Sequence, residues 1–448
     1  MRLLALPLLL LTAACAGTPK ESVVMAPEPI EAAPPPAPVA GGATGPGYNV
    51  DANTGEVPNS STVSQQVANP NEAGFQNYLA VTRERFLAKG ITPATWNAAF
   101  NGVHLNMKSI GLTSGASGGM GRISTYLERV EPLVSKGRGA VATNRAALEA
   151  AARTTGVDPM AIAGIWGNET GYGAVLGNFY VVEALASLAY EGRRRAFFED
   201  ELLAALTLLQ QGLVTRAELT GSYAGALGQV QFMPSNILKL GMDGDGDGER
   251  DLRGSLPDAF TSCGNYLRSH GWRTGEPTIA EARLPANFRW EQAGPDIQLT
   301  AAQWDAMGVS TIDGKRLSSL VPADQPVSIL LPAGYKGIPI IAFENYRRFL
   351  DYNPSQAYAI SVAQLGNRLA GSSDFRQSWP ADLRGMTAAS VKEMQTYLLR
   401  LGYDVTADGR FGDKTRRAVR AYQLAEGLPA DGYPTDALLA RLRGEPVS

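Results

Sequence analysis

Apolar residues recur at spacings of three and four positions over most of the chain beyond residue 73, a pattern that predicts amphipathic helices. The clearest such segments are residues 75–89, 92–100, 143–155, 196–211 and 355–369. Alternation of apolar and polar residues, typical of a half-buried strand, is rare, and residues 327–331 form one of the few plausible strands. We therefore expect a mainly α body over residues 73–378.

The residues before this body lack the periodicity and divide into two parts. Residues 1–15 carry one positive charge, then a short apolar run, then small residues before Cys15, as export signals do. The apolar run is too short to span a bilayer. Residues 16–72 are rich in Pro, Ala, Gly and Ser. Because few large apolar side chains are present there to offset the entropy of ordering, we expect a disordered tether.

The residues around Cys15 resemble a bacterial lipoprotein signal, in which cleavage precedes a cysteine that is then lipidated. Thr12 replaces the usual leucine, and Ala16 resembles the residue found after the cysteine in lipoproteins sent to the outer membrane. The resemblance implies a periplasmic protein anchored to the outer membrane by lipid at Cys15, which leaves Cys263 without a disulfide partner. The alternative is an ordinary secretory signal whose cleavage site happens to contain a cysteine.

Length and composition narrow the class of protein. A chain of 448 residues is expected to form two or three domains. The formal net charge of -3 gives no electrostatic reason to expect a nucleic-acid partner. With only His104 and His270, a metal site built from several histidines is excluded, and any Ser-His-Asp arrangement would need one of these two. Two cysteines do not make a disulfide framework.

The most informative segment begins at Asp158-Pro159, where a capping side chain precedes a ring whose missing N–H costs nothing at a helix start. The residues three, four and seven positions before Glu169 in this helix are all apolar: Trp166, Ile165 and Ile162. Glu169 therefore shares the apolar stripe, where a carboxylate is costly unless it is paired or protonated. Desolvation raises the pKa of a carboxyl group, as a general acid requires at neutral pH.

Composition alone leaves other interpretations of this segment open. A glutamate near a helix end is commonly solvated or ion-paired, and the apolar stripe does not remove that alternative. Gly171-Tyr172-Gly173 is expected to end the helix in a turn that allows close approach and places an aromatic ring beside the carboxyl group.

Two further segments offer neutral polar groups that suit sugar hydroxyl and N-acetyl groups. Residues 221–235 are rich in Gly and Ala, which permit close approach, and carry Ser222 and Gln231. Residues 343–355 contain Tyr352 and Asn353 directly before a proline, a turn signal. On composition alone, tight helix packing and a plain turn explain these two segments at least as well.

Several groups of these residues occur in one order along the chain. They are Glu169-Thr170-Gly171-Tyr172-Gly173; Ala224-Gly225-Ala226-Leu227-Gly228-Gln229 through Gln231-Phe232-Met233-Pro234-Ser235; and Asn265-Tyr266-Leu267 before His270-Gly271-Trp272. With Tyr352-Asn353 they closely resemble the membrane-bound lytic transglycosylase B family of bacterial cell-wall enzymes over about residues 75–375. The resemblance implies a lysozyme-like α domain that cleaves the MurNAc–GlcNAc bond of peptidoglycan and leaves a 1,6-anhydromuramoyl end.

The same resemblance assigns Glu169 as the sole catalytic carboxyl group. It would first protonate the glycosidic oxygen and then remove the C6 hydroxyl proton as that oxygen closes on C1. The matching sugar-binding positions are Tyr172, Ser222, Gln231, Tyr266, Tyr352 and Asn353. Intramolecular attack requires neither a cofactor nor a bound water. The alternatives are a hydrolytic muramidase with a second carboxylate and a non-catalytic cell-wall-binding lipoprotein.

Residues 111–119 depart from the polar segment that the family usually carries at this place. They contain Gly115-Ala116-Ser117-Gly118-Gly119, a formal match to the Gly-x-Ser-x-Gly nucleophile elbow of hydrolases. A true elbow lies between an apolar strand and a helix. Because the sequence before this motif is loop-like and rich in Thr and Ser, we do not expect a serine hydrolase.

Residues 243–254 have the outline of a calcium-binding loop. Acidic side chains occupy positions 1, 3, 5 and 9 of an EF-hand-like pattern: Asp243, Asp245, Asp247 and Asp251. Position 12, where a bidentate glutamate is expected, is Gly254, so the loop is incomplete. By resemblance to the family, Asp258 closes the site and a bound Ca²⁺ is structural. The alternative is a solvated acidic turn.

The segment 385–444 contains a weak internal duplication. Each half reads helix, Gly turn, Asp-Gly turn and helix, with Asp408-Gly409 in the first half and Asp431-Gly432 in the second. This pattern resembles the small three-helix peptidoglycan-binding module. The resemblance implies that the module holds a monomeric enzyme close to the glycan strands of peptidoglycan. A helical appendage that binds nothing is the alternative.

Overall fold

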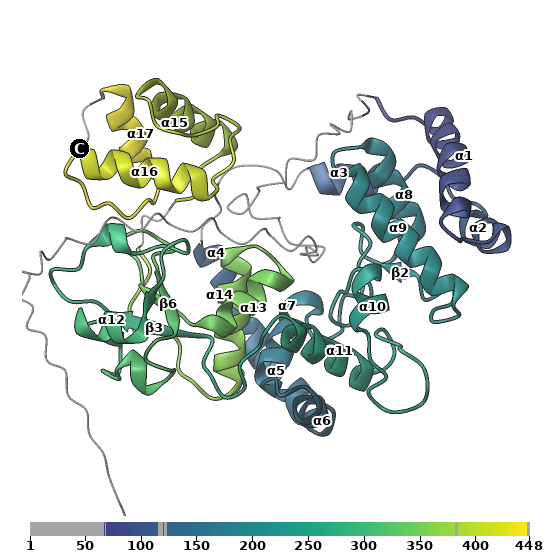
Figure 1. The fold of residues 1–448 in the computed structure, drawn as a ribbon, viewed down its shortest axis with the longest axis horizontal. Helices are drawn as coiled ribbons and strands as arrows, with labels where there is room; N and C mark the ends of the chain where they lie inside the picture. Colours follow the sequence, from purple (N-terminus) through teal and green to yellow (C-terminus); the bar gives the residue numbers. More distant parts are fainter. Residues whose placement is uncertain (1–66, 68, 115–119, 121–122, 381–383, 446–448) are drawn as a thin grey trace, which may run out of the picture. The chain divides into compact units, whose positions relative to one another are not determined.

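The computed structural model describes residues 67, 69–114, 120, 123–380 and 384–445 (Figure 1). The expected signal at residues 1–15, nearly all of the tether and the elbow-like motif at residues 115–119 lie outside the described residues. Among the helices that the structure describes, none is long and apolar enough to cross a membrane.

The first two helices of the N-terminal part begin at side-chain caps. Asn71 accepts the backbone N–H of Gly74 at 2.9 Å, and Thr92 accepts that of Thr95 at 3.2 Å, so each satisfies a donor at the start of a helix. The helices of this part are α1 (Glu72–Ala88), α2 (Pro93–Phe100), α3 (Met107–Ser114), α4 (Ile123–Leu127), α5 (Val130–Thr143) and α6 (Arg145–Thr155).

The middle of the chain is also helical. It forms α7 (Pro159–Thr170), α8 (Val181–Glu191), α9 (Arg195–Gln210), α10 (Pro234–Leu240), α11 (Leu256–Ser269), α13 (Glu344–Tyr352) and α14 (Gln356–Leu369), with the short strands β1 (Phe179–Tyr180) and β2 (Thr220–Gly221). Asp158 caps α7 as the sequence predicts, accepting the N–H of Met160 at 2.6 Å. All five periodic segments lie on helices, which confirms the mainly α prediction.

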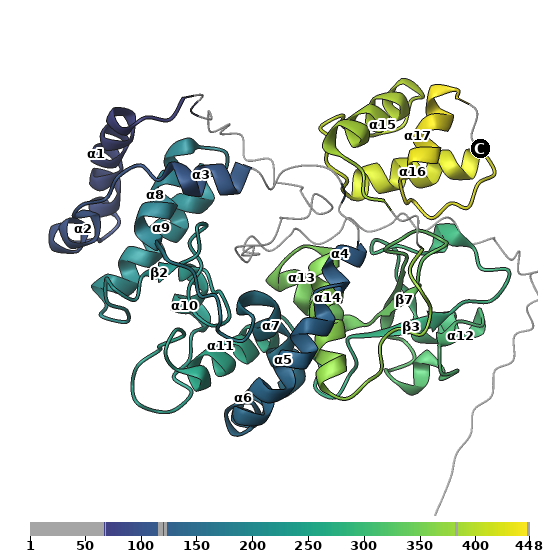
Figure 2. The ribbon, with the colours of Figure 1, turned by 180° about the vertical axis from the view of Figure 1, so that it is seen from behind.

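A small antiparallel sheet follows α11 (Figure 2). Its strands are β3 (Ile279–Arg283), β4 (Leu299–Thr300), β5 (Ser310–Thr311), β6 (Pro326–Leu330) and β7 (Ile340–Ala342), in the order β4-β6-β7-β3-β5. Ile341 pairs with Ile329 across β7 and β6. Trp304 of α12 (Ala301–Ala306) and Phe288 belong to a separate apolar core beside the sheet, near the 3-10 turns η2 (Trp290–Gln292) and η3 (Leu317–Ser319). The expected strand is confirmed as β6.

Helices α7 and α14 pack closely because glycine occupies the crossing on both of them. A Cβ atom added at Gly164 of α7 would lie 2.8 Å from the carbonyl oxygen of Val362. A Cβ atom added at Gly366 of α14 would lie 2.9 Å from the carbonyl oxygen of Met160. The backbones therefore approach more closely than any larger residue would allow. This spacing determines how near the side chains of the two helices can come.

The C-terminal module has the three helices that the sequence predicts. They are α15 (Ala388–Arg400), α16 (Asp413–Ala425) and α17 (Asp436–Arg443). Thr387 caps α15 by accepting the N–H of Ser390, and Thr435 caps α17 by accepting that of Leu438. A mainly α protein with a small three-helix C-terminal domain is thus confirmed.

Candidate active site

Glu169 lies in the last turn of α7, where the apolar stripe of the helix carries it into the interior. Only 7% of the residue is exposed. Ile162, Ile165 and Trp166 on the same stripe are buried as well. The expected buried carboxyl group is therefore confirmed, and the alternative of a solvated glutamate is wrong.

The two carboxyl oxygens of Glu169 have different surroundings. Oε1 accepts a hydrogen bond from the Tyr358 hydroxyl at 2.6 Å, whereas Oε2 has no hydrogen-bond partner among the described residues. Burial raises the pKa of Glu169 to about 8, because the carboxylate loses its hydration, and the hydrogen bond from Tyr358 opposes this rise. At neutral pH the group is therefore mostly neutral, and Oε2 is a buried oxygen whose hydrogen-bonding capacity the described residues leave unused.

Tyr358 is a site residue that the sequence pattern does not single out. It lies in the first turn of α14, 189 positions after Glu169, and is fully buried. Ser355 accepts the backbone N–H of Tyr358 at 3.2 Å and so begins the helix. The crossing at Gly164 and Gly366 then brings the two helices together. No local signal in the sequence reveals the partner of the Tyr358 hydroxyl.

The turn after α7 has an unusual backbone. Gly171, Tyr172 and Gly173 all have positive φ. The φ of Tyr172 is 62°, a backbone conformation that residues other than glycine rarely adopt. The Tyr172 hydroxyl donates to the carbonyl oxygen of Leu133 on α5 at 2.9 Å, and its ring stands edge-on to Trp166. Tyr172 thus ties the end of α7 to α5, and its sugar-binding role stays a prediction.

The Gly- and Ala-rich segment lies against the end of α7 through Gln229. The Trp166 indole donates to Gln229 Oε1 at 3.0 Å, and the Thr170 hydroxyl donates to the Gln229 carbonyl oxygen at 2.8 Å. These contacts place the segment that carries Ser222 and Gln231 beside Glu169. Gln229 ends one of the motifs that carry the family resemblance, but the sequence assigned no role to it.

Both predicted sugar-binding residues of this segment are buried and help to shape it. Ser222 Oγ accepts the N–H of Ala226 at 3.1 Å, and Gln231 Nε2 donates to the carbonyl oxygen of Gly228 at 2.9 Å. Gln231 has a φ of 54°, so its backbone is also in the left-handed region. The strained turn holds the Gln231 amide in one orientation.

Tyr266 on α11 and Tyr352 on α13 meet edge to face, with ring centroids 5.0 Å apart. The Tyr266 hydroxyl donates to the carbonyl oxygen of Asp351 at 2.6 Å, and the Tyr352 hydroxyl donates to that of Val230. Burial raises the pKa of Tyr352, and the nearby ionisable groups of Cys263 and Glu169 add to this rise. Three segments distant in sequence therefore converge near the carboxyl group.

Asn353 differs from these residues because its polar groups are not used by the fold. It is almost fully buried, and neither its amide oxygen nor its amide nitrogen has a hydrogen-bond partner within the described chain. A buried amide without partners costs free energy. Asn353 and Glu169 Oε2 are thus polar groups of the predicted site that a ligand could satisfy.

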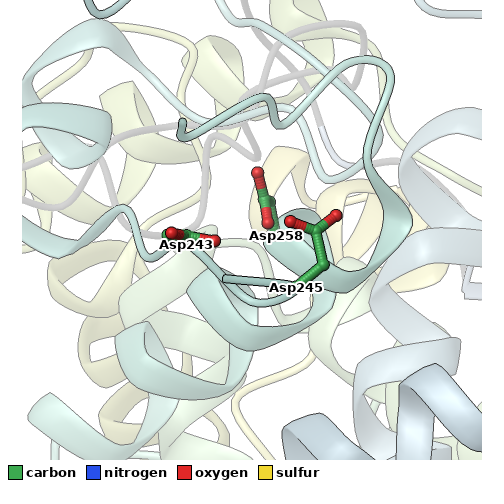
Figure 3. A group of neighbouring side chains, drawn as sticks. All are labelled: Asp243, Asp245 and Asp258. Atoms are coloured by element: carbon green, nitrogen blue, oxygen red, sulfur yellow. The ribbon is translucent and has the colours of Figure 1, made fainter. Parts of the chain in front are cut away.

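The acidic loop after α10 brings three of the predicted metal ligands together (Figure 3). Asp243 and Asp245 lie on the loop and Asp258 on the first turn of α11, and one oxygen from each lies within 4.8 Å of the others. Asp258 is fully buried, and its pKa is raised by desolvation and by the charge of Asp245. Asp247 is not in this group, and its carboxylate instead accepts the N–H of Glu249.

The three carboxylates suit a hard cation that prefers oxygen ligands, such as Ca²⁺. Asp243 and Asp258 accept backbone N–H groups, including that of Gly246 to Asp243 and that of Gly244 to Asp258. Asp245 accepts the Ser255 hydroxyl at 2.8 Å. These bonds hold the carboxylates in place, and the remaining lone pairs of each oxygen can still face an ion. Three carboxylates this close repel one another, and a bound cation would remove the repulsion.

Residues 74–367, more than half of the chain, match the family model described as the transglycosylase SLT domain. The chain belongs to this transglycosylase family. All the predicted catalytic and sugar-binding residues lie inside the SLT domain. Residues 387–442 match the model of a peptidoglycan binding domain. The resemblance stated from the motifs is therefore confirmed, while the domain limits at 73–378 and 385–444 stay predictions.

Relatives from two bacteria resemble this SLT protein. Membrane-bound lytic murein transglycosylase B of Escherichia coli (strain K12) is 33% identical over 236 residues, which cover 50% of this chain and 60% of that protein. SltB3 from Pseudomonas aeruginosa, solved in complex with NAG-NAM-pentapeptide, is 39% identical with a TM-score of 0.79, covering 82% of this chain and 99% of that one. Escherichia coli Slt35, solved in complex with calcium, is 26% identical with a TM-score of 0.56, covering 70% and 98%.

Proposed function

We propose that this protein is a lytic transglycosylase that cleaves the MurNAc–GlcNAc bond of peptidoglycan and leaves 1,6-anhydroMurNAc ends. The observation that carries the proposal is the state of Glu169. It is a buried carboxyl group with a pKa raised to about 8. Tyr358 holds one of its oxygens, and the other has no hydrogen-bond partner among the residues that the structure describes. Membership of the transglycosylase family supports the class of reaction.

In the proposed mechanism one carboxyl group acts twice. Neutral Glu169 donates the proton on Oε2 to the glycosidic oxygen, and the hydrogen bond from Tyr358 stabilises the carboxylate that forms. The carboxylate then takes the proton from the C6 hydroxyl of the same sugar while that oxygen attacks C1. Because the attack is intramolecular, it gains effective molarity and needs no bound water.

The electrostatic environment of Glu169 favours this mechanism over that of a two-carboxylate muramidase. A hydrolytic enzyme places a second carboxylate about 5 to 10 Å from the first, and that charge would raise the pKa of the acid. Among the described residues, the causes of the Glu169 shift are desolvation and the Tyr358 hydrogen bond, with no charged neighbour.

The neutral polar residues around Glu169 suit a sugar that carries an N-acetyl group. The Asn353 amide offers a donor and an acceptor that no other described residue uses, and these match the carbonyl oxygen and N–H of an N-acetyl group. Ser222, Gln231, Tyr266 and Tyr352 orient the sugar through the loops that they hold, and Tyr172 fixes the turn beside the acid. SltB3, which this chain resembles, was solved with NAG-NAM-pentapeptide.

The products of purified sacculi test the proposal. We expect muropeptides that weigh one water less than hydrolysed ends when analysed by mass spectrometry. The Glu169→Gln variant should bind sacculi but release less than about 1% of the wild-type product, because it cannot donate a proton. Hydrolysed ends would favour a muramidase, and the absence of release by the wild type would favour a non-catalytic wall-binding protein.

We also propose that the protein works in the periplasm, anchored to the outer membrane by lipid at Cys15. The signal-like residues before Cys15 support this location, and the relative from Escherichia coli is named membrane-bound. In cell fractionation we expect the protein in the membrane fraction, whereas the Cys15→Ser variant should appear in the soluble periplasmic fraction. Equal distribution of both would contradict the anchor.

A further inference from the structure

The first half of the C-terminal module contains a fixed arrangement of polar groups around its Asp-Gly turn. Gln395 on α15 accepts the N–H of Gly409 at 2.8 Å and donates to Asp408 Oδ1 at 3.1 Å. The same Oδ1 accepts the N–H of Arg410 at 2.8 Å. One carboxyl oxygen of Asp408 is therefore used to build the turn.

The second half repeats this arrangement atom for atom. Gln423 on α16 accepts the N–H of Gly432 at 2.7 Å and donates to Asp431 Oδ1 at 2.7 Å. This Oδ1 accepts the N–H of Tyr433 at 2.8 Å. The weak duplication in the sequence thus corresponds to two equivalent Asp-Gly turns. In each turn a glutamine binds the Gly N–H and the Oδ1 atom of the aspartate (the Gln395 bracket and the Gln423 bracket), and the aspartate Oδ2 atom takes no part in these bonds.

The second half uses its remaining groups to hold backbone of the SLT part of the chain. Asp431 Oδ2 accepts the N–H of Tyr335 at 2.8 Å, and the Arg420 guanidinium donates to the carbonyl oxygen of Ala293 at 2.8 Å. The same guanidinium also forms an ion pair with Asp296 at 3.3 Å. Asp431 therefore binds one backbone N–H, and Arg420, three positions before Gln423, binds one backbone carbonyl oxygen.

These two contacts are possible because a glycine lies next to each backbone group that is bound, Gly334 before Tyr335 and Gly294 after Ala293. A Cβ atom at Gly334 would lie 2.8 Å from Asp431 Oδ2, and one at Gly294 would lie even closer to the Arg420 guanidinium. The two positions of the module therefore accept peptide backbone that is flanked by very small side chains.

The first half presents the same pair of charged groups to solvent. Lys392 precedes Gln395 by three positions, as Arg420 precedes Gln423, and both Lys392 and Asp408 are exposed. Asp408 Oδ2 has no hydrogen-bond partner recorded within residues 384–445, the described part of the module. The pair that the second half uses internally is thus still available in the first half.

We propose that Lys392 and Asp408 bind the backbone of the stem peptide of peptidoglycan, with Lys392 on a carbonyl oxygen and Asp408 on an amide N–H. This inference rests on the proposed function, which makes peptidoglycan the polymer in contact with the module. The alanine-rich stem peptide provides amide groups between small side chains, as the contact of the second half requires. The N-acetyl amides of the glycan are the competing ligand in the same polymer.

Sedimentation of the full chain with purified sacculi tests the assignment. The Glu169→Gln background prevents digestion, and Lys392→Gln/Asp408→Asn is added to it. Loss of two charge-assisted hydrogen bonds at an exposed site should weaken binding about tenfold. Soluble stem peptide should displace the parent protein, and peptide-free glycan strands should not. The matched control is Asp404→Asn/Lys414→Gln, which removes an exposed ion pair of the same module with the same change in charge.

The outcomes separate this assignment from the proposed function. Unchanged binding of the double variant, or displacement by glycan strands instead of stem peptide, would overturn the assignment while leaving the enzyme proposal intact. Failure of the parent protein to sediment at all would contradict the wall-binding role of the module. Lys392→Gln alone serves as a second variant that cannot disturb the Gln395 bracket, because Lys392 takes no part in it.

Discussion

At the scale of single residues, the fold keeps the Glu169 carboxyl group protonated at neutral pH, and this costs free energy of folding that can be measured. The pKa of Glu169 rises from 4.5 to about 8 on folding, so the folded chain binds a proton that the unfolded chain releases above pH 4.5. The neutral form is fully stabilising below pH 4.5, and this contribution is lost as pH rises toward 8. Stability should therefore fall across this window.

The Glu169→Gln variant measures that cost because its side chain is neutral at every pH. We expect the melting temperature of the variant to rise relative to that of the wild type as the pH increases from 5 to 9. The corresponding difference in the free energy of unfolding should reach a few kcal/mol, at about 1.4 kcal/mol per pKa unit. Thermal denaturation at a series of pH values checks this, and a difference that stays constant with pH would show that Glu169 titrates normally.

The Tyr358 hydroxyl should tune the pKa of Glu169, while the buried ring, which phenylalanine keeps, supports the fold. In Tyr358→Phe the hydrogen bond that lowers the pKa of Glu169 is lost, so the basic limb of the kcat/KM profile should move up by about one pH unit. The carboxylate formed during the reaction also loses its donor, and kcat should fall about 10- to 100-fold with little change in KM.

Tyr78→Phe is the matched control for this experiment. The Tyr78 hydroxyl donates to a glutamate as well, Glu199 at 2.9 Å, but on α1 and α9 instead of the active site. Its pH profile should equal that of the wild type. If both variants changed the profile equally, or neither did, the positioning role of Tyr358 would be excluded.

At the scale of elements, the crossing of α7 and α14 decides whether Tyr358 reaches Glu169. Gly366→Ala places a Cβ atom 2.9 Å from a backbone oxygen of α7, so the helices must separate. We expect a loss of about 1 to 3 kcal/mol in stability and a fall in activity even at temperatures where the variant is folded. Thermal denaturation and sacculus digestion measure the two effects.

The control for the crossing is Gly139→Ala on α5. A Cβ atom at Gly139 would meet no atom within 4 Å, so the substitution removes only the flexibility of glycine inside a helix. It should stabilise the protein by about 0.5 to 1 kcal/mol and leave activity unchanged. A similar response from both variants would mean that close approach at Gly366 is not what matters.

At the scale of the whole molecule, the acidic loop is expected to add stability only when it holds a cation. Calcium should raise the melting temperature after EDTA treatment, since it removes repulsion among Asp243, Asp245 and Asp258. Asp258→Asn should abolish the increase. Asp247→Asn should keep it, because Asp247 lies outside the group. No response of the wild type to EDTA or calcium would exclude a structural ion.

The position of Asp247 in the structure shows that the spacing of acidic residues in the sequence does not by itself predict which carboxylates meet. The alternating acidic residues indicated a loop with several ligands, and Asp243 and Asp245 do converge. Alternation places Asp247 with them only if the loop continues in one regular curve. The backbone turns at Gly246 and Gly248, both with positive φ, and the Asp247 carboxylate caps its own turn instead. Which carboxylates meet therefore depends on the path of the whole loop.

Local patterns determined most of what could be known without coordinates. The helices, the cap at Asp158, the buried stripe that contains Glu169 and the duplicated module all depend on residues within a few turns of one another. The family also followed from short motifs in a defined order. Most strands of the sheet could not be predicted, because segments of two to five residues are too short to show a period.

Only the tertiary structure decided the contacts between distant segments. It assigned Tyr358 to Glu169 across 189 positions and joined one half of the module to Tyr335 and Ala293. It also left the Asn353 amide without a partner within the described part of the chain. Side-chain periodicity reports which face of an element is buried but not what covers it. The identity of the covering residue depends on how closely the backbones approach, as the glycines of α7 and α14 show.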